Sequence, residues 1–546
     1  MTMEGENSDD FMQLSEKVAK KFLHTIVVVD DEATFEEKRI SPKELIQPTR
    51  RGKDKDNGSS SEDDHKRGTQ HGLNAKEVID NFASKGIICS ILKPEINGNS
   101  DLFKSVAKRT DVFIIDWEIN NDDGDTALQI IDDIIKSDKP QEPRLRLIII
   151  YTGETDVDKI SSKIQTTLKE LFGNDFDVTD NEATFTRGHL RIGIYLKNEL
   201  GLDQKFVERV IPEEGLSRIV SSEFSKITAG LISNVALESI SILRDNTHLI
   251  LGKLGPQIDP PYLTHRVWVD NPDEAMDYAV EIINSEFRSV LENCEVGHKV
   301  DSRVIKKWLE FKNPDHKFVI HAPNKTKKEV DLDAIEKLIE KGIEPSRKDL
   351  GIGKQWYKSF TKTFCFDGEN DNNLNNNFAI LTTFKNRYGE TNFCPFLTQG
   401  TILKNENSSA SVNYWLCIQP RYDCVRIEEK RYFYFLPLNV VESENDKFDI
   451  VIHGEDDDFV KLEIGFQTYD GKAFEFPVQS QNERIIKAEQ QEGSFVFKTT
   501  DEQKFTWIAE MKYEQIQRVA HEFASKLSRV GLNEYEWLRL RAGRKE

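Results

Sequence analysis

The stretch Asp111-Val-Phe-Ile-Ile-Asp116 joins a short apolar run to a terminal aspartate, and it sets the interpretation of the N-terminal region. A run this short and this apolar is typical of a strand buried on both faces of a parallel sheet. His24–Val29 has the same character, and Asp30 and Asp31 follow it directly. Two such strands, each ending in carboxylates, predict an acidic edge on one sheet.

The same pattern continues along the chain. Three further apolar runs predict strands at 87–92, 145–151 and 190–196, and the last two are followed by Thr152 and Lys197. Apolar residues at helical spacing predict the intervening helices, at 74–84, 101–108, 126–135 and 158–171. Five strands that alternate with helices predict an α/β fold built from parallel βαβ units with right-handed crossovers.

The polar residues at the strand ends indicate one kind of chemistry. In an open parallel sheet, ligands bind at the carboxyl ends of the strands, so Asp30, Asp31, Asp116, Thr152 and Lys197 are expected to share a pocket. Clustered carboxylates favour a hard cation such as Mg²⁺, whereas an amine and a hydroxyl can bind phosphoryl oxygens. The sequence therefore predicts that a phosphoryl group is transferred to a carboxylate oxygen of Asp116.

This set of residues resembles the receiver domain of two-component response regulators. The resemblance covers about residues 22–230 and includes a further motif, an Asp-Gly pair after the phosphoacceptor, which is Asp123-Gly124 here. It implies a flavodoxin-like fold with a five-stranded parallel sheet of order 2-1-3-4-5. It also implies a cytoplasmic phosphoprotein that takes its phosphoryl group from a sensor histidine kinase and loses it slowly, rather than a turnover enzyme.

The resemblance assigns a role to each acidic residue. Asp116 would be the phosphoacceptor, and Asp31 and Asp116 would bind Mg²⁺ directly. Asp30 would act partly through water, and the main-chain carbonyl of Glu118 would be a further metal ligand. A phosphatase of the haloacid-dehalogenase type is disfavoured, because it needs Asp-x-Asp after the strand and the third position here is Glu118.

Other positions of the resemblance concern the switch. Thr152 would supply the switch hydroxyl, and Lys197 would bind the phosphoryl group. The family usually has Pro after this lysine, but this chain has Asn198. The family's switch aromatic corresponds to Ile194, whereas the neighbouring Tyr195 should face the other side of the strand. We therefore expect the usual coupling between the threonine and the aromatic residue to be absent.

A narrower resemblance comes from the stretch 227–255, ITAGLISNVALESISILRDNTHLILGKLG. It is similar to receivers of anti-phage signalling proteins of the Detocs type, in which a sensor kinase feeds a receiver–effector and a second receiver protein that acts as a phosphate buffer. The resemblance implies a companion receiver–effector as a further partner. Two alternatives stay open: an effector with a phosphorylation-controlled enzymatic C-terminal domain, and a degenerate receiver used for dimerisation.

Composition divides the remainder of the chain. Residues 1–21 are expected to be a flexible N-terminus, and an insertion at about 47–72 is expected to be disordered because it has almost no apolar residues. The sequence of residues 231–360 predicts a helical connector, with helices at 273–291 and 327–341. Residues 361–546 predict a β-rich α+β domain, with strands at 364–366, 378–384, 414–418, 431–438 and 461–468 and a helix at 512–530.

Charge and hydropathy limit the function. The net charge of −21 argues against binding to nucleic acid or to an anionic membrane. No apolar run approaches the roughly 18 residues that a membrane helix needs, and the polar start lacks the features of a secretory signal. We therefore expect a cytoplasmic protein with no nucleic-acid or membrane partner, and a homodimer stays open. In Tyr414–Ile427, Cys417, Arg421, Asp423 and Cys424 could line a site or form a buried strand and turn.

Overall fold

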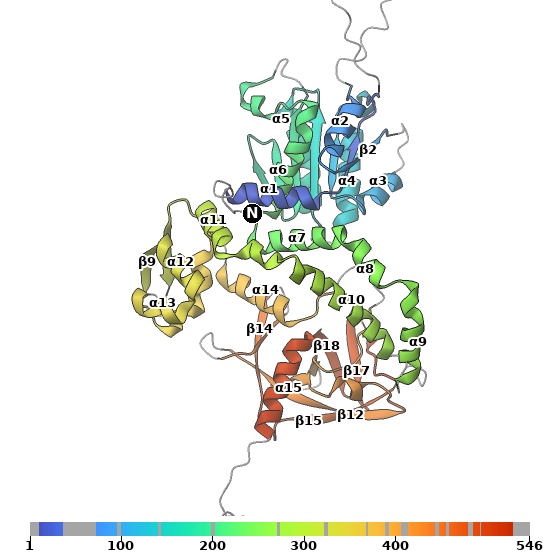
Figure 1. The fold of residues 1–546 in the computed structure, drawn as a ribbon, viewed down its shortest axis with the longest axis vertical. Helices are drawn as coiled ribbons and strands as arrows, with labels where there is room; N and C mark the ends of the chain where they lie inside the picture. Colours follow the sequence, from blue (N-terminus) through green and yellow to red (C-terminus); the bar gives the residue numbers. More distant parts are fainter. Residues whose placement is uncertain are drawn as a thin grey trace, which may run out of the picture. The chain divides into compact units, whose positions relative to one another are not determined.

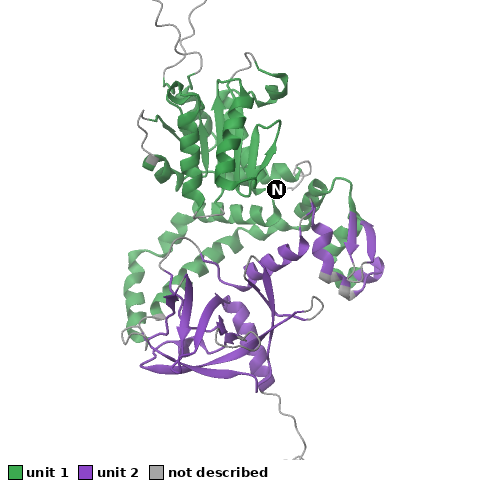
Figure 2. Cartoon of the chain, turned by 180° about the vertical axis from the view of Figure 1, so that it is seen from behind, with its two compact units in different colours: residues 1–317, 331–346 green, residues 318–330, 347–546 purple. Residues whose placement is uncertain are grey.

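The chain forms two compact units, residues 1–317 with 331–346 and residues 318–330 with 347–546 (Figure 2). The computed structural model describes residues 10–35, 72–94, 100–139, 144–197, 202–269, 274–321, 326–366, 368, 370–387, 393–405, 413–442, 447–454, 458–478, 484–491 and 493–527. Asn198 and nearly all of the predicted insertion at 47–72 lie outside these ranges. The predicted domain boundaries at 230 and 360 stay a prediction.

Unit 1 contains a seven-stranded, mostly parallel sheet of order β2-β1-β3-β4-β7-β6-β5 (Figure 1). Its strands are β1 Thr25–Val29, β2 Ile88–Leu92, β3 Val112–Ile115, β4 Arg146–Thr152, β5 Asp177–Thr179, β6 Thr184–Arg187 and β7 Leu190–Leu196. Strands β1, β2, β3, β4 and β7 pair in parallel, whereas β5 and β6 are antiparallel to their neighbours.

The predicted number of five strands is wrong, because the hairpin β5–β6 extends the sheet beyond β7. Its strands are only 3 and 4 residues long, so they carry no clear alternation of apolar and polar residues. The turn between them places Asp180, Asn181 and Glu182 at positive φ, a conformation that Asn and Asp tolerate better than most residues. A hairpin this short and polar is indistinguishable from a loop in the sequence.

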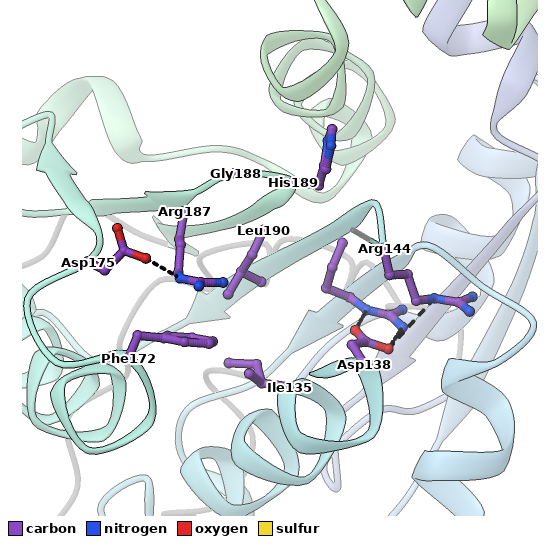
Figure 3. Close-up of a pocket in the computed structure, with 10 residues that line it drawn as sticks. Ile135, Asp138, Arg144, Phe172, Asp175, Arg187, Gly188, His189 and Leu190 are labelled. Atoms are coloured by element: carbon purple, nitrogen blue, oxygen red, sulfur yellow. Dashed lines mark hydrogen bonds and ion pairs between the residues drawn. The ribbon is translucent and has the colours of Figure 1, made fainter. Parts of the chain in front are cut away.

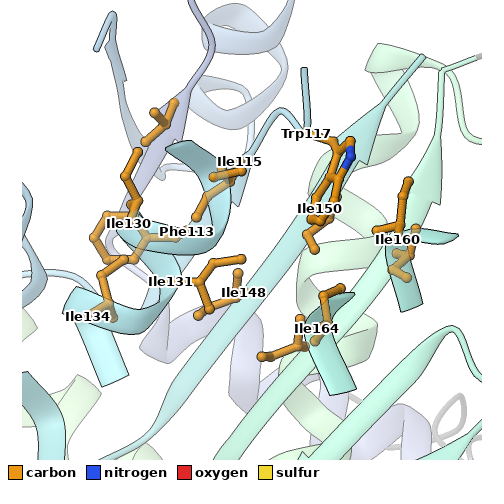
Figure 4. Packing of buried hydrophobic residues seen from close by; sticks show 14 of the residues in the cluster. Phe113, Ile115, Trp117, Ile130, Ile131, Ile134, Ile148, Ile150, Ile160 and Ile164 are labelled. Atoms are coloured by element: carbon orange, nitrogen blue, oxygen red, sulfur yellow. The ribbon is translucent and has the colours of Figure 1, made fainter. Parts of the chain in front are cut away.

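The sheet of unit 1 lies between two layers of helices. Strand residues alternate between a core shared with α3, α4 and α5 (Figure 4) and a core shared with α1, α2 and α6. These helices are α1 Phe11–Phe22, α2 Ala75–Ala83, α3 Ser100–Ala107, α4 Asp125–Asp138, α5 Val157–Phe172 and α6 Leu216–Thr228. Each fully buried aliphatic side chain contributes about 1.5–3 kcal/mol to folding.

Helix α1 corrects the prediction that residues 1–21 are flexible. Asp10 caps the helix by accepting a hydrogen bond from the backbone N–H of Gln13, 2.8 Å away. Phe11, Val18 and Phe22 are buried on one face of α1, which contacts α6 and α7. The acidic start of the chain obscured this amphipathic spacing.

Helices make up much of the described part of residues 231–360, and the role of this segment as a connector stays a prediction. Its helices within unit 1 are α7 Leu231–Asp245, α8 Thr247–Lys253, α9 Asp259–Trp268, α10 Glu274–Asn293, α11 Ser302–Lys312 and α12 Leu332–Lys341. The helix predicted at 327–341 is wrong in its first part, because β9 Lys327–Asp331 pairs there with β8 Lys317–His321. Helix α12 begins only after Asp331, whose side chain accepts a hydrogen bond from the N–H of Ala334. Helix α13 Ile343–Leu350 follows.

Unit 2 is β-rich, as predicted for the C-terminal region. Its antiparallel sheet has the order β13-β14-β12-β11-β10-β18-β17-β16, and β15 also pairs with β12. The strands are β10 Thr401–Asn405, β11 Asn413–Cys417, β12 Lys430–Val440, β13 Ile450–His453, β14 Phe459–Ile464, β15 Lys472–Pro477, β16 Glu489–Gln491, β17 Ser494–Lys498 and β18 Lys504–Glu510. Helix α15 Tyr513–Leu527 confirms the predicted terminal helix within the described residues.

Two predicted strands of unit 2 are wrong. Residues 378–384 lie almost entirely in helix α14, Asp371–Thr383. Phe364 ends a 3₁₀ segment, and the two residues after it belong to no strand. Asn370 caps α14 by accepting hydrogen bonds from the N–H groups of Asn372 and Asn373. Asn370 therefore marks the start of a helix here.

Candidate phosphoacceptor site

Four strands of unit 1 bring the predicted polar residues to one edge of the sheet. Asp30, Asp116 and Lys197 each follow a parallel strand directly, and Thr152 is the last residue of β4. The N–H of Asp116 donates to the carbonyl of Val29 at 2.9 Å, and the N–H of Lys197 donates to the carbonyl of Thr152 at 2.8 Å. The backbone ladder therefore continues to the ends of these strands and fixes where their side chains begin.

Lys197 connects two of the carboxylates. Its Nζ lies 2.6 Å from Oδ2 of Asp116 and 3.1 Å from Oδ2 of Asp30. These residues are 81 and 167 positions away from Lys197 in the sequence. The side chains of Asp30, Asp116 and Lys197 are exposed by only 2%, 9% and 8%, so their interaction is weakly screened by water.

Burial and charge act in opposite directions on these groups. Burial raises the pKa of Asp30 to about 6, although the ammonium of Lys197 opposes this shift. Burial also disfavours the charged form of Lys197, but Asp116 and Asp30 outweigh it and raise the pKa of Lys197. The site therefore holds a charged lysine between two carboxylates that repel each other.

The oxygens of the three aspartates fit a cation. Oδ2 of Asp30 and of Asp116 binds Lys197, and Oδ2 of Asp31 accepts a hydrogen bond from the N–H of Asn120 at 2.9 Å. Within the described residues, the Oδ1 atoms of Asp30, Asp31 and Asp116 are buried and have no hydrogen-bond partner. Buried anionic oxygens without partners are costly, and a hard cation would satisfy them.

No ready-made metal cage accompanies these oxygens. In the part of the chain that the structure describes, no group of three or more His, Cys, Asp and Glu side chains is placed to hold a metal ion by itself. Mg²⁺ does not need such a cage, because it usually keeps several waters and binds one or two carboxylates. Glu118, whose main-chain carbonyl is the predicted further ligand, lies in the loop two residues after Asp116.

The loop after β3 is shaped by two residues of opposite size. Trp117 is fully buried, and Gly124 adopts a φ of +87° against its indole ring. A Cβ added at Gly124 would lie 2.1 Å from Cε2 of Trp117. Glycine is required at this position both for its backbone conformation and for the close approach. Gly124 was predicted from its place after Asp123, whereas Trp117 was not predicted. The available signal for Trp117 was a large apolar side chain directly after the acidic end of the strand.

Asp123 anchors the same loop to helix α5. Its side chain pairs with Lys159 at 2.6 Å and with Lys163 at 3.1 Å, and these hydrogen bonds lower the pKa of Asp123. Asn120 and Asp123 have φ values of 57° and 58°, so the loop is tightly wound. This winding directs the N–H of Asn120 to Asp31 and thereby connects the loop to the acidic pair.

Tyr195 faces the opposite side of the sheet from Ile194, as predicted, whereas the switch role of Thr152 stays a prediction. Thr152 is fully buried, and its Oγ1 accepts a hydrogen bond from the N–H of Glu154 at 3.1 Å. Ile194 packs in the core with α4 and α5, whereas Tyr195 packs in the opposite core with α6. Tyr195 also lies under the guanidinium of Arg209, 4.9 Å from the ring centroid. The aromatic ring is therefore on the other face of the sheet from Ile194.

The cysteine-containing stretch of unit 2 is a strand followed by a turn. Cys417 ends β11, and Cys424 ends a short 3₁₀ turn that starts at Arg421. Both cysteines are fully buried in one hydrophobic cluster, and burial raises the pKa of the Cys417 thiol. Neither thiol is placed to act as a nucleophile.

Comparison with known proteins identifies the class of the N-terminal region. Residues 22–201 match the family of the response receiver domain. This region is a receiver domain, and its presence supports a response-regulator-like role. No curated protein and no solved structure matches the chain. Among the described residues, no helix has the length and apolar character needed to span a membrane.

Proposed function

We propose that this receiver accepts a phosphoryl group on Asp116 from a sensor histidine kinase, in a reaction that requires Mg²⁺. The observation that carries the proposal is the placement of Lys197, whose Nζ lies within 3.1 Å of both Asp116 and Asp30. A receiver without phosphoacceptor function has no physical need to bury two repelling carboxylates beside one lysine.

The residues divide the reaction between them. A carboxylate oxygen of Asp116 attacks phosphorus while the bond from phosphorus to the donor's imidazole nitrogen breaks, which gives an acyl phosphate on Asp116. Lys197 pairs with a phosphoryl oxygen, and the Thr152 hydroxyl donates a hydrogen bond to another. Asp31, Asp116 and the main-chain carbonyl of Glu118 would hold Mg²⁺ directly, and Asp30 would act partly through water. The cation would screen the negative charge that meets at the site.

The proposal is tested with acetyl phosphate as a small-molecule donor. The purified full chain is incubated with acetyl phosphate and Mg²⁺, and the added phosphoryl group is measured by intact mass. Asp116→Asn and a sample with EDTA serve as controls. We expect a labile adduct only in the wild type that is incubated with Mg²⁺. An adduct of equal yield in Asp116→Asn would contradict the assignment of the acceptor.

The output of phosphorylation defines two versions of the proposal. The protein either passes the signal on through its C-terminal region or competes for phosphoryl groups and prevents spurious activation of a companion receiver–effector. We favour the second version, in bacterial anti-phage defence, because of the sequence of residues 227–255. Asp116→Asn should then cause toxicity in cells that contain the kinase and its effector. A loss of output without toxicity would instead assign an effector role, including a phosphorylation-controlled enzyme.

A further inference from the structure

A second candidate site lies in the receiver at the opposite edge of the sheet from Asp116. A cavity of about 380 Å³ opens beside the first residues of β4 and β7 and the last residues of α4 and α5 (Figure 3). Cavities of roughly 300–1,000 Å³ are the usual size for small-molecule sites. None of the residues assigned to phosphoryl transfer lines it.

One wall of the cavity comes from the hairpin that extends the sheet. Arg187 ends β6, and Gly188 at a φ of +53° turns the chain towards Leu190 at the start of β7. The guanidinium of Arg187 lies 4.3 Å from the ring centroid of Phe172 and pairs with Asp175 at 3.0 Å. This wall therefore presents a cation, an aromatic ring and an exposed carboxylate together.

The opposite wall is held by a buried arginine. Arg146 is 1% exposed, and it donates to both carboxylate oxygens of Asp138 and to the carbonyls of Thr110 and Ala107. Because Arg146 fixes Asp138, it also positions Arg144, whose Nε lies 3.7 Å from Oδ1 of Asp138. Figure 3 shows Arg144 and Asp138 on one side of the cavity and Arg187 and Phe172 on the other.

The charge of this cavity differs from that of the chain. Three arginines line it, against two carboxylates, in a protein whose net charge is −21. Between the arginines lie the apolar surfaces of Ile135, Phe172 and Leu190. Guanidinium groups bind phosphate and carboxylate through paired hydrogen bonds, and a ring of a ligand can stack on phenylalanine.

We propose that this cavity binds a small anion of mononucleotide size that carries a planar ring. Its ring would lie on Phe172, Ile135 and Leu190, and its anionic group would bind Arg187. Asp138 or Asp175 would accept hydrogen bonds from ring N–H groups. The site is separate from the phosphoacceptor site, so its existence does not depend on phosphorylation of Asp116.

The test uses AMP as the probe and the full chain in EDTA, so that divalent cations cannot bind at Asp116. Calorimetric titration of the wild type and of Asp116→Asn should give the same one-to-one binding. Arg187→Met should weaken binding at least tenfold, because a charge-assisted contact is lost. Arg288→Met is the matched control, since Arg288 is an exposed arginine paired with Glu292 at 3.0 Å outside the cavity. It should bind as the wild type does.

A second variant separates loss of AMP binding from a folding defect in Arg187→Met. Phe172→Leu keeps Arg187 and should weaken the binding of AMP about tenfold through lost stacking, while the circular dichroism spectrum stays that of the wild type. Absence of AMP binding, equal binding by Arg187→Met, or inorganic phosphate binding as tightly as AMP would each overturn the proposal. The arginines would then serve only to neutralise the carboxylates and helix C-termini around them.

Discussion

Single residues of the phosphoacceptor site show how the sequence prepares it for a cation. Each of the three aspartates uses one oxygen for Lys197 or for a backbone N–H and leaves the other buried without a partner among the described residues. The arrangement costs free energy in the absence of a ligand. Under the proposed function, a cation bound here would offset this cost and stabilise the folded receiver.

Mg²⁺ should therefore stabilise the folded receiver. A ligand at 100 times its dissociation constant adds about 2.7 kcal/mol to the free energy of unfolding. We expect thermal unfolding of the wild type to shift upward with Mg²⁺. Asp31→Asn, which removes one anionic oxygen and keeps the side-chain volume, should lose most of this shift. An equal shift in both proteins would place the cation elsewhere.

Gly124 offers a prediction about the loop that carries Trp117. Gly124→Ala should destabilise the protein by about 2–4 kcal/mol, because strain at a positive φ is added to overpacking against the indole ring. Gly86→Ala is the matched control, since Gly86 has a φ of +76° and nothing within 4 Å of an added Cβ. Chemical denaturation measures both. If Gly124→Ala lowers the free energy of unfolding by no more than Gly86→Ala does, then Trp117 moves aside freely.

Secondary-structure elements of the receiver are joined by a buried ion pair. Nε of Arg191 on β7 donates to Glu223 on α6 at 2.6 Å, and Glu223 also pairs with Lys226 at 2.6 Å. Burial opposes the charge of Glu223, but Arg191 and Lys226 outweigh it and lower the pKa of Glu223. The pair therefore stabilises the folded state when the pH is above the ordinary pKa of a glutamate.

Glu223→Gln should remove this pH-dependent part of the stability. Loss of one partner of a buried pair costs about 3–5 kcal/mol. Because the folded pKa of Glu223 is lowered, the difference between wild type and variant should be full above about pH 5 and should shrink as the pH falls below the unfolded value of 4.5. Urea unfolding between pH 3 and pH 7 measures it. A difference that does not change with pH would show that packing, not charge, is responsible.

The sequence predicted some of these elements better than others, for physical reasons. The parallel strands are continuous apolar runs, and their polar ends follow from the direction of the chain in a βαβ unit. The hairpin β5–β6 carries no such run, and α14 is rich in asparagine and is capped by Asn370. The contact between Gly124 and Trp117, like the unpartnered oxygens, depends on side-chain positions that no spacing rule supplies.

The whole molecule has two units, each with its own hydrophobic cores. Phe433 is fully buried in a core of unit 2, so Phe433→Ala should lower the stability of that unit by about 3–5 kcal/mol. Phosphorylation by acetyl phosphate should stay unchanged, because every residue assigned to it belongs to unit 1. Calorimetry and intact mass measure the two effects. Loss of phosphorylation in a variant whose receiver remains folded would contradict this separation.

The most direct test of the central claim is to locate the phosphorylated side chain. The protein is phosphorylated with Mg²⁺ and acetyl phosphate, the acyl phosphate is reduced with borohydride to homoserine, and the modified position is mapped by peptide mass spectrometry. We predict homoserine at position 116 and at no other aspartate. Homoserine at Asp30 or Asp31, or none after phosphorylation with the cognate kinase, would contradict the assignment of Asp116 as the phosphoacceptor.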